Sequence, residues 1–157
     1  MLRAATILAV MPLIVVGADT EAGEAILRRI GDRPEREVRV FVSDEATALD
    51  LRNRGFKVAL GDLSDSGHIE AAATRCFSAV LIAEAAIDGR EVSFARDSDE
   101  VLRGWAEAVG RSKVSRVIWV GGEPQPDTSV PEVVSVDPRH PDLAERVVAL
   151  DDAHSVP

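Results

Sequence analysis

The feature that most constrains this chain is an apolar tetrapeptide that runs into a glycine turn and then into a helical pattern. Leu13–Val16 is uniformly apolar, and Gly17 and Gly23 follow it six residues apart, with helically spaced apolar residues beyond. Such a strand, turn and helix open a βαβ unit, in which free amides at the helix N-terminus can receive a pyrophosphate. The sequence therefore predicts an α/β fold with a candidate phosphate-binding turn.

Apolar runs rich in valine and isoleucine alternate with helical patterns along most of the chain. Because their apolarity is continuous rather than alternating, they are expected to be strands buried on both faces of a parallel sheet. Right-handed crossovers then give a doubly wound, Rossmann-like sheet with strand order 3-2-1-4-5. The predicted strands are Leu13–Val16, Val38–Val42, Lys57–Leu60, residues 79–83 and Arg116–Val120, with residues 133–136 as a short candidate sixth.

Four helical patterns lie between these strands, and each has one apolar face. Gly31, Gly55 and Gly110 are expected to end the first, second and fourth helices. Asp97 and Glu100 resemble a capping box at the start of the fourth. The residues expected to face inward are Ala22, Ala25, Ile26 and Ile30, then Ala46 and Leu49, then Ile69, Ala72, Ala73 and Cys76, and finally Val101, Leu102, Trp105 and Val109.

The length of 157 residues suits one domain with a single fold, so residues 1–157 are expected to form it alone. Within it we expect a proline-rich loop over 123–141, a last helix over 141–150 and a flexible tail over 151–157. Arg3 and the apolar residues after it are similar to a signal peptide. Cleavage at the end of that stretch would remove the first strand, so a buried strand is the favoured interpretation.

The charge and the cysteine content bound the setting and the partners. A net charge of −9, with lysine only at Lys57 and Lys113, argues against nucleic-acid binding, which needs clustered cations. The apolar stretches are too short to span a membrane. Cys76 is the single cysteine, so a reducing, cytoplasmic setting is expected, with Cys76 as a core residue rather than a redox thiol. The histidines are scattered and are expected at the surface, and no metal site is expected.

The turn supplies the first candidate cofactor-binding residues. Thr20 stands at the middle position of a GxxGxxG pattern, where glycine lets the backbone approach a pyrophosphate. Its hydroxyl could donate to a phosphate, whereas Asp19 and Glu21 would repel one if they faced inward. Asp19 could instead cap the helix, and the turn could be purely structural. The candidate residues of the turn are Gly17, Asp19, Thr20, Glu21, Ala22 and Gly23.

The ends of the later strands supply the second group of candidates. Ser43 and Asp44 lie about twenty residues beyond the turn, where an acid can accept a hydrogen bond from a ribose 2′-hydroxyl. No arginine stands there to bind a 2′-phosphate, so NAD is favoured over NADP. Asp62 could reach an adenine amino group, and Leu63 and Ala83 complete the group. Each acid could equally cap a helix or close a turn.

The order of these motifs resembles the atypical short-chain dehydrogenases/reductases, in particular their NmrA-like and NAD(P)H-binding flavin-reductase-like branch. The matching segments are residues 16–23, 38–42, 61–65, 79–82 and 114–122, the last with the double glycine Gly121-Gly122. The resemblance implies NAD or NADP as cofactor. The chain contains no tyrosine, so the family's Tyr-x-x-x-Lys pair is absent, and Ser43 replaces the arginine usual in NADP-binding members. No catalytic residue is therefore assigned.

Three functions remain open. The first is an NAD(P)-binding protein of redox-sensing or regulatory type, without standard dehydrogenase catalysis. The second is a small NAD(P)H-dependent flavin- or quinone-type reductase that uses residues 121–130 as its substrate loop. The third is a degenerate Rossmann domain that binds a protein partner and no nucleotide. Because the substrate-binding part of typical members is reduced here, a homodimer or a partner could complete the cleft.

Overall fold

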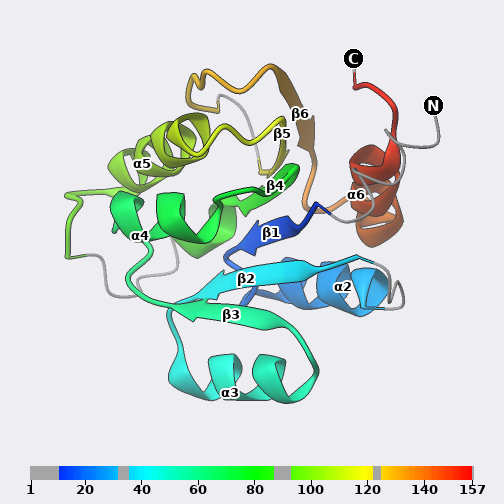
Figure 1. The fold of residues 1–157 in the computed structure, drawn as a ribbon, viewed down its shortest axis with the longest axis horizontal. Helices are drawn as coiled ribbons and strands as arrows, with labels where there is room; N and C mark the ends of the chain where they lie inside the picture. Colours follow the sequence, from blue (N-terminus) through cyan, green and yellow to red (C-terminus); the bar gives the residue numbers. More distant parts are fainter. Residues whose placement is uncertain (1–10, 32–35, 87–92, 122–124, 157) are drawn as a thin grey trace.

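A six-stranded parallel sheet with the order β3-β2-β1-β4-β5-β6 forms the centre of the computed structural model, which describes residues 11–31, 36–86, 93–121 and 125–156 (Figure 1). The strands are β1 (Leu13–Val16), β2 (Val38–Val42), β3 (Lys57–Leu60), β4 (Ser78–Ile82), β5 (Arg116–Val120) and β6 (Glu132–Val136). The predicted Rossmann-like α/β class, the strand order and the sixth strand are confirmed. β4 starts and ends one residue earlier than predicted, which leaves Ala83 outside the sheet.

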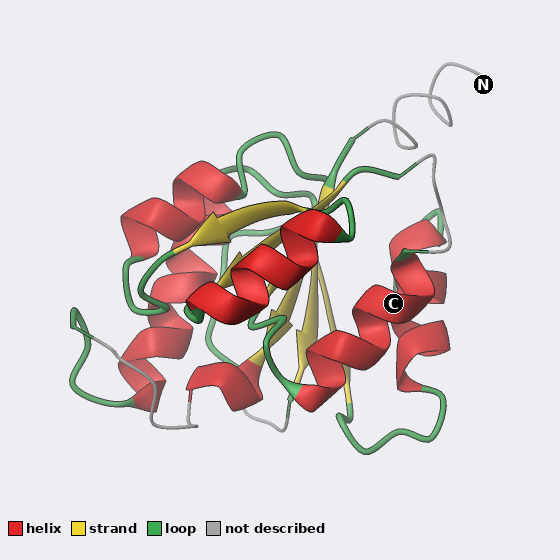
Figure 2. Ribbon diagram, turned by 90° about the horizontal axis from the view of Figure 1, so that it is seen from below, coloured by secondary structure: helices red, strands yellow, loops and turns green. Residues whose placement is uncertain are grey.

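Helices cover both faces of the sheet, as Figure 2 shows from below. The helices are α2 (Glu21–Ile30), α3 (Glu45–Asn53) and α6 (Leu143–Asp152) on one face and α4 (Ser66–Ala72) and α5 (Ser98–Arg111) on the other, with the short 3₁₀ helix η1 (Ala83–Ala86) after β4. Alternate strand residues feed two cores. In β1, Leu13 and Val15 pack on the α2 side, and Ile14 and Val16 pack on the α5 side. This explains the continuous apolarity of the central strands.

The inward face of α3 differs from the prediction. Ala46 and Leu49 are exposed, the latter by 60%, whereas Ala48 and Leu51 are buried. Both pairs have the same spacing of three, so periodicity in so short a helix could not choose between them. Ala25 of α2 is likewise exposed rather than inward. Packing against the sheet decided both faces.

The helix ends agree only in part with the predicted glycine stops. Gly55 has a φ of +95° directly after α3, as expected for a glycine that ends a helix. Gly31 is the C-cap of α2, as predicted, but it keeps a helical φ of −60°. α5 instead runs through Gly110 and ends one residue later. A Cβ on Gly110 would lie 2.5 Å from the Ser129 hydroxyl, so this glycine admits the loop before β6 rather than ending the helix.

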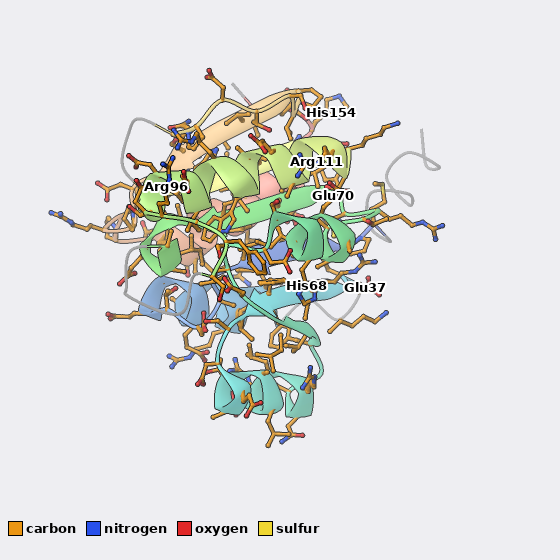
Figure 3. The ribbon with its side chains drawn as sticks, turned by 90° about the vertical axis from the view of Figure 1, so that its left-hand side faces the viewer. Glu37, His68, Glu70, Arg96, Arg111 and His154 are labelled. Atoms are coloured by element: carbon orange, nitrogen blue, oxygen red, sulfur yellow. The ribbon has the colours of Figure 1, made fainter. Side chains whose placement is uncertain are left out.

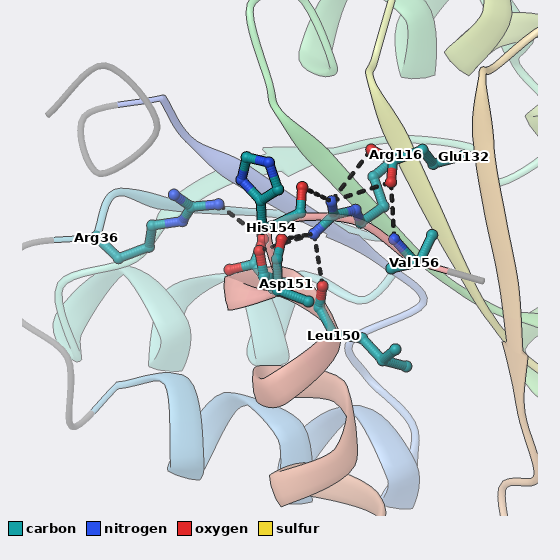
Figure 4. A network of polar contacts seen from close by, with 8 residues as sticks. Arg36, Arg116, Glu132, Leu150, Asp151, His154 and Val156 are labelled. Carbon is teal, nitrogen blue, oxygen red and sulfur yellow. Dashed lines mark hydrogen bonds and ion pairs between the residues drawn. The ribbon is translucent and has the colours of Figure 1, made fainter. Parts of the chain in front are cut away.

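The amino edge of the sheet holds a buried polar network that closes the end of α6 (Figure 4). Arg116 is fully buried and donates to the carbonyl oxygens of Leu150, Asp151, Ala153 and His154 and to the carboxylate of Glu132. These carbonyls belong to the last turn of a helix and to the residues after it, where no further helical amides are available. Arg116 therefore acts as a side-chain cap for α6.

The last helix extends two residues into the segment 151–157, which the sequence predicts to be a flexible tail. The last helix starts at Leu143 and runs to Asp152, rather than covering 141–150. Asp151 is buried and forms an ion pair of 2.7 Å with Arg36, whose side chain is also buried. The Val156 amide also donates to Glu132. These contacts join the segment to the amino edge of the sheet, and composition alone could not indicate them.

No helix in the described parts of the chain is both long enough and apolar enough to cross a membrane. Arg3 and the residues up to position 10, on which the signal-peptide similarity depends, lie outside the described residues. The apolar stretch ends as β1, which pairs with β2 on one side and β4 on the other.

Candidate functional site

The turn between β1 and α2 depends on two glycines that admit no side chain. Gly17 has a φ of +86°, and a Cβ there would lie 2.6 Å from the Cβ of Ala85 in η1. A Cβ on Gly23 would lie 2.5–2.7 Å from three backbone atoms of Ala18. The start of α2 therefore packs directly on the turn, and the structural roles predicted for Gly17 and Gly23 are present.

Thr20 closes this turn with both of its hydrogen-bonding functions. Its hydroxyl accepts from the Gly23 amide at 3.0 Å and donates to the Gly17 carbonyl at 2.8 Å. Thr20 is thus the N-cap of α2, so the alternative in which Asp19 caps this helix is wrong. The one hydroxyl proton is also committed, so a diphosphate at this turn would be bound without the Thr20 hydroxyl or the Gly23 amide.

Asp19 joins the turn to the end of β2. Its carboxylate accepts from the Ser43 amide at 3.3 Å and faces the Ser43 hydroxyl at 3.5 Å. The next residue, Asp44, is the N-cap of α3 and accepts from the amide and hydroxyl of Thr47 at 2.9 and 2.7 Å. Asp44 therefore caps a helix, which is the structural alternative to a ribose contact. One carboxylate oxygen of Asp44 accepts both hydrogen bonds.

Asp62 organises the end of β3. One carboxylate oxygen accepts from the amide and hydroxyl of Ser64, and the other accepts from the Ser93 amide at 2.8 Å. Burial raises the pKa of Asp62, but these hydrogen bonds outweigh it and leave the pKa below its ordinary value. Leu63 next to it is fully buried, and its carbonyl accepts from the indole N–H of Trp105 at 2.7 Å. The Leu63 side chain therefore lies in the core.

Four of the predicted residues, Asp19, Ser43, Asp44 and Asp62, line one cavity of about 860 Å³ at the carboxyl ends of β1, β2 and β3. We call it the β1–β3 groove. The described residues that line it are Asp19, Ser43, Asp44, Glu45, Thr47, Leu60, Gly61, Asp62, Ser93 and Phe94. Four of these residues are acids and none is lysine or arginine. The groove therefore favours hydroxyl and amino donors over phosphate groups.

Glu21 and Ala22 lie in a different cavity, of about 620 Å³, between α2 and α6. Glu84 and His140 also line it. The beginning of α2 thus separates two hollows at the same edge of the sheet, with Asp19 on one side and Glu21 on the other. Ala83 opens η1, and a Cβ on Gly121 would lie 2.7 Å from the Ala83 Cβ. Gly122, the second glycine of the pair, lies outside the described residues.

The sequence analysis did not single out the residues that complete the β1–β3 groove, notably Glu45, Thr47, Ser93 and Phe94. Ser93 and Phe94 come from the segment between β4 and α5, far from the groove's other residues in sequence. One signal was available, because Phe94 is a lone aromatic residue in a polar stretch. Only the fold could place it against the end of β3.

His68 is half-buried, which corrects its expected surface position. The His68 side chain is labelled in Figure 3. Its ring lies edge-on to Phe41, with centroids 4.9 Å apart, and a Cβ on Gly61 would lie 2.3 Å from its Nδ1. A side chain at position 61 would therefore have to displace the His68 ring. Among the described residues no group of three or more histidine, cysteine, aspartate or glutamate side chains is placed to hold a metal ion.

Cys76 is buried, as predicted, although α4 ends four residues before it. Burial raises the pKa of its thiol from 9.0 to about 11. A shift of two units lowers the thiolate fraction about 100-fold. We therefore expect iodoacetamide to alkylate Cys76 at least about 100-fold more slowly in the native protein than in urea at pH 8. Equal rates in the two states would contradict this, with free cysteine as the reference for reagent reactivity.

Several solved structures have a similar fold, and reductases are among them. Triphenylmethane reductase of Citrobacter sp. complexed with NADP(H) has a TM-score of 0.58 and 16% identity over 70% of this chain. The NADPH-dependent quinone oxidoreductase QOR2 of Escherichia coli, complexed with NADPH, has a TM-score of 0.56 and 18% identity over 69% of this chain. ChuY of E. coli O157:H7, an anaerobillin reductase, has a TM-score of 0.53 and 21% identity over 69% of this chain.

These likenesses show the fold. The aligned part makes up 37%, 36% and 50% of the three solved chains, so this protein spans about half their length or less. No protein-family model matches the sequence, and no curated protein is significantly similar to it.

Proposed function

We propose that this chain binds a nicotinamide adenine dinucleotide at the carboxyl edge of its sheet, with NAD favoured over NADP. We further propose that it acts in the cytoplasm as a redox-sensing or regulatory protein, without standard dehydrogenase catalysis. The observation that carries the proposal is the β1–β3 groove, a cavity of about 860 Å³ at the strand ends where open α/β sheets bind ligands. The NADP(H) and NADPH complexes of the similarly folded reductases support the ligand class.

The residues present suit the adenosine half of the ligand better than its phosphates. Ser43 and Asp44 would hold the ribose, and Asp62 with the Ser93 backbone would face the base. Among the described residues that line the groove there is no lysine or arginine for a 2′-phosphate, and the four acids there would repel one. The remaining predicted residues, Gly17, Thr20, Glu21, Ala22, Gly23, Leu63 and Ala83, would shape the turn and its surroundings.

A bound nicotinamide would supply hydride chemistry. The chain contributes no tyrosine that could serve as proton donor beside it. This is why the proposal assigns binding and no reaction.

Thermal unfolding with NAD, NADH, NADP and NADPH tests the proposal. Ligand at 100 times its Kd stabilises the folded state by about 2.7 kcal/mol, which raises Tm by roughly 5–10 °C in a domain of this size. We expect this shift with NAD or NADH and a much smaller one with the phosphorylated forms. Ser43→Arg, which places a cation at the end of β2, should raise the affinity for NADPH about tenfold.

Absence of any shift at millimolar concentrations of all four nucleotides would contradict the proposal and favour a domain that binds only a protein partner. The similarly folded reductases make a flavin- or quinone-type reductase the second candidate. Its sign would be loss of the reduced-nicotinamide absorbance on adding a flavin or quinone to protein and NADH. That result would replace the non-catalytic part of the proposal and keep the binding part.

A further inference from the structure

Phe94 is the most exposed large apolar side chain among the described residues, with 69% of its surface accessible. The other large one is Leu49 on α3, at 60%. Phe94 lines the β1–β3 groove and Leu49 does not. An exposed phenyl ring gives up the burial that would stabilise the fold by roughly 1.5–3 kcal/mol, so its position at a ligand-sized cavity needs a reason.

The backbone that carries this ring is held against the end of β3. The Phe94 amide donates to the Ser64 hydroxyl at 2.9 Å, and the Ser93 amide donates to the Asp62 carboxylate at 2.8 Å. Ser64 in turn donates to the other oxygen of Asp62 at 2.6 Å. The carboxylate thus ties the segment before α5 to the floor of the groove.

The chain is also held on the far side of Phe94. Ala95 packs against the core beneath α5, and the Arg96 amide donates to Glu100 in the first turn of that helix at 2.8 Å. Below, the Leu63 carbonyl is held by the buried indole of Trp105. The backbone of Phe94 is therefore anchored on both sides, and this places its side chain at the groove.

The chemistry beside the ring selects a planar ligand with amino donors. The groove offers the acceptor groups of Asp62, Asp44 and Asp19 together with one aromatic face. A flat heterocycle gains by stacking on an aromatic side chain, and an exocyclic amino group can donate to a carboxylate. Adenine has both properties, whereas a phosphate group has neither and is repelled by the acids.

We infer that Phe94 forms one wall of an adenine-binding site in the β1–β3 groove, with the base stacked on its ring. This inference rests on the proposed function, because the base is that of the dinucleotide. Asp62 then has a positioning role, since it holds the Phe94 segment in place while it faces the base.

The test compares wild-type protein with Phe94→Leu, which keeps an apolar side chain but removes the ring. Leu49→Ala is the matched control, since it removes the other exposed large apolar side chain outside the groove. The probes are NAD, adenosine and nicotinamide mononucleotide. Calorimetry measures the affinity of each probe, and NMR measures the chemical shifts of the adenine H2 and H8 protons. We expect Phe94→Leu to lower the affinity for NAD and for adenosine about tenfold, or about 1.4 kcal/mol. The affinity for nicotinamide mononucleotide should not change. The upfield ring-current shift of the adenine protons should also disappear.

The outcomes separate this inference from the proposed function. If wild type and Phe94→Leu bind NAD equally, with the same adenine shifts, the stacking role is wrong and dinucleotide binding stands. If adenosine binds in a Phe94-dependent way and NAD does not bind, the stacking role stands and the proposed function is wrong. If wild type binds neither NAD nor adenosine, both are overturned.

Discussion

Replacing Arg116 by alanine is expected to lower the free energy of unfolding by about 3–5 kcal/mol, the range for removing one partner of a buried, hydrogen-bonded charge pair. Arg116 is fully buried, and its guanidinium bonds the carbonyls that end α6 and the carboxylate of Glu132 (Figure 4). Its loss would leave those carbonyls without donors inside the protein. Urea unfolding followed by circular dichroism measures the change.

Two further variants and a pH series check the cause. Arg116→Lys keeps the positive charge but loses the planar guanidinium group. Its free energy of unfolding should therefore lie between those of wild type and Arg116→Ala. Arg28→Ala, which removes an exposed pair with Glu24 on α2, should cost about 0.5 kcal/mol or less. A stability loss in Arg116→Ala as small as that of Arg28→Ala would contradict the capping role.

The stability that Arg116 and Glu132 contribute to the fold should decrease at low pH. Burial raises the pKa of Glu132, but the Val156 amide and Arg116 outweigh it and leave this pKa below its ordinary value of 4.5. A carboxyl group whose pKa is lower in the folded than in the unfolded state stabilises the fold at pH values above its unfolded-state pKa. This stabilisation is lost as the pH falls through the folded-state pKa. The stability difference between wild type and Arg116→Ala should therefore narrow below about pH 4.5.

Gly23→Ala is expected to destabilise the fold by roughly 3 kcal/mol and to weaken dinucleotide binding. The added methyl would lie 2.5–2.7 Å from the carbonyl group and Cα of Ala18, which are backbone atoms and cannot rotate away. α2 would have to move off the turn, and Asp19 would lose its register with the end of β2. Chemical denaturation gives the first quantity, and calorimetry with NAD gives the second.

Gly67→Ala is the matched control for this substitution. It lies in α4, where the added methyl would have the Asp65 carboxylate 3.6 Å away and nothing closer. Alanine is a better helix former than glycine, so stability should stay the same or rise by up to about 1 kcal/mol. If Gly23→Ala behaves in the same way, the close packing of α2 on the turn does not constrain the fold.

The sequence predicted the sheet well because continuous apolar strands and alternating helices leave few topologies open. It could not choose the inward face of α3, because Ala46 with Leu49 and Ala48 with Leu51 share one spacing. It also gave no sign that Arg116 bonds the carbonyls of residues 151, 153 and 154, since composition does not reveal a buried partner across the sheet.

At the candidate site, sequence spacing found Asp19, Ser43, Asp44 and Asp62, and the fold brings these four into one cavity. Spacing could not show that the Thr20 hydroxyl is committed to its own turn, because hydroxyl direction depends on the local backbone. It also gave no reason to join Phe94 to this group.

Local pattern alone thus determined that this chain forms a parallel, doubly wound sheet with its candidate site residues at the carboxyl edge. Hydrophobic periodicity and glycine positions act over a few residues, and so they can be read directly from the chain. Tertiary structure decided which acids share a groove, which aromatic ring stands beside them and where the buried arginine finds its acceptors. Those relations join residues tens of positions apart, and only packing brings such residues together.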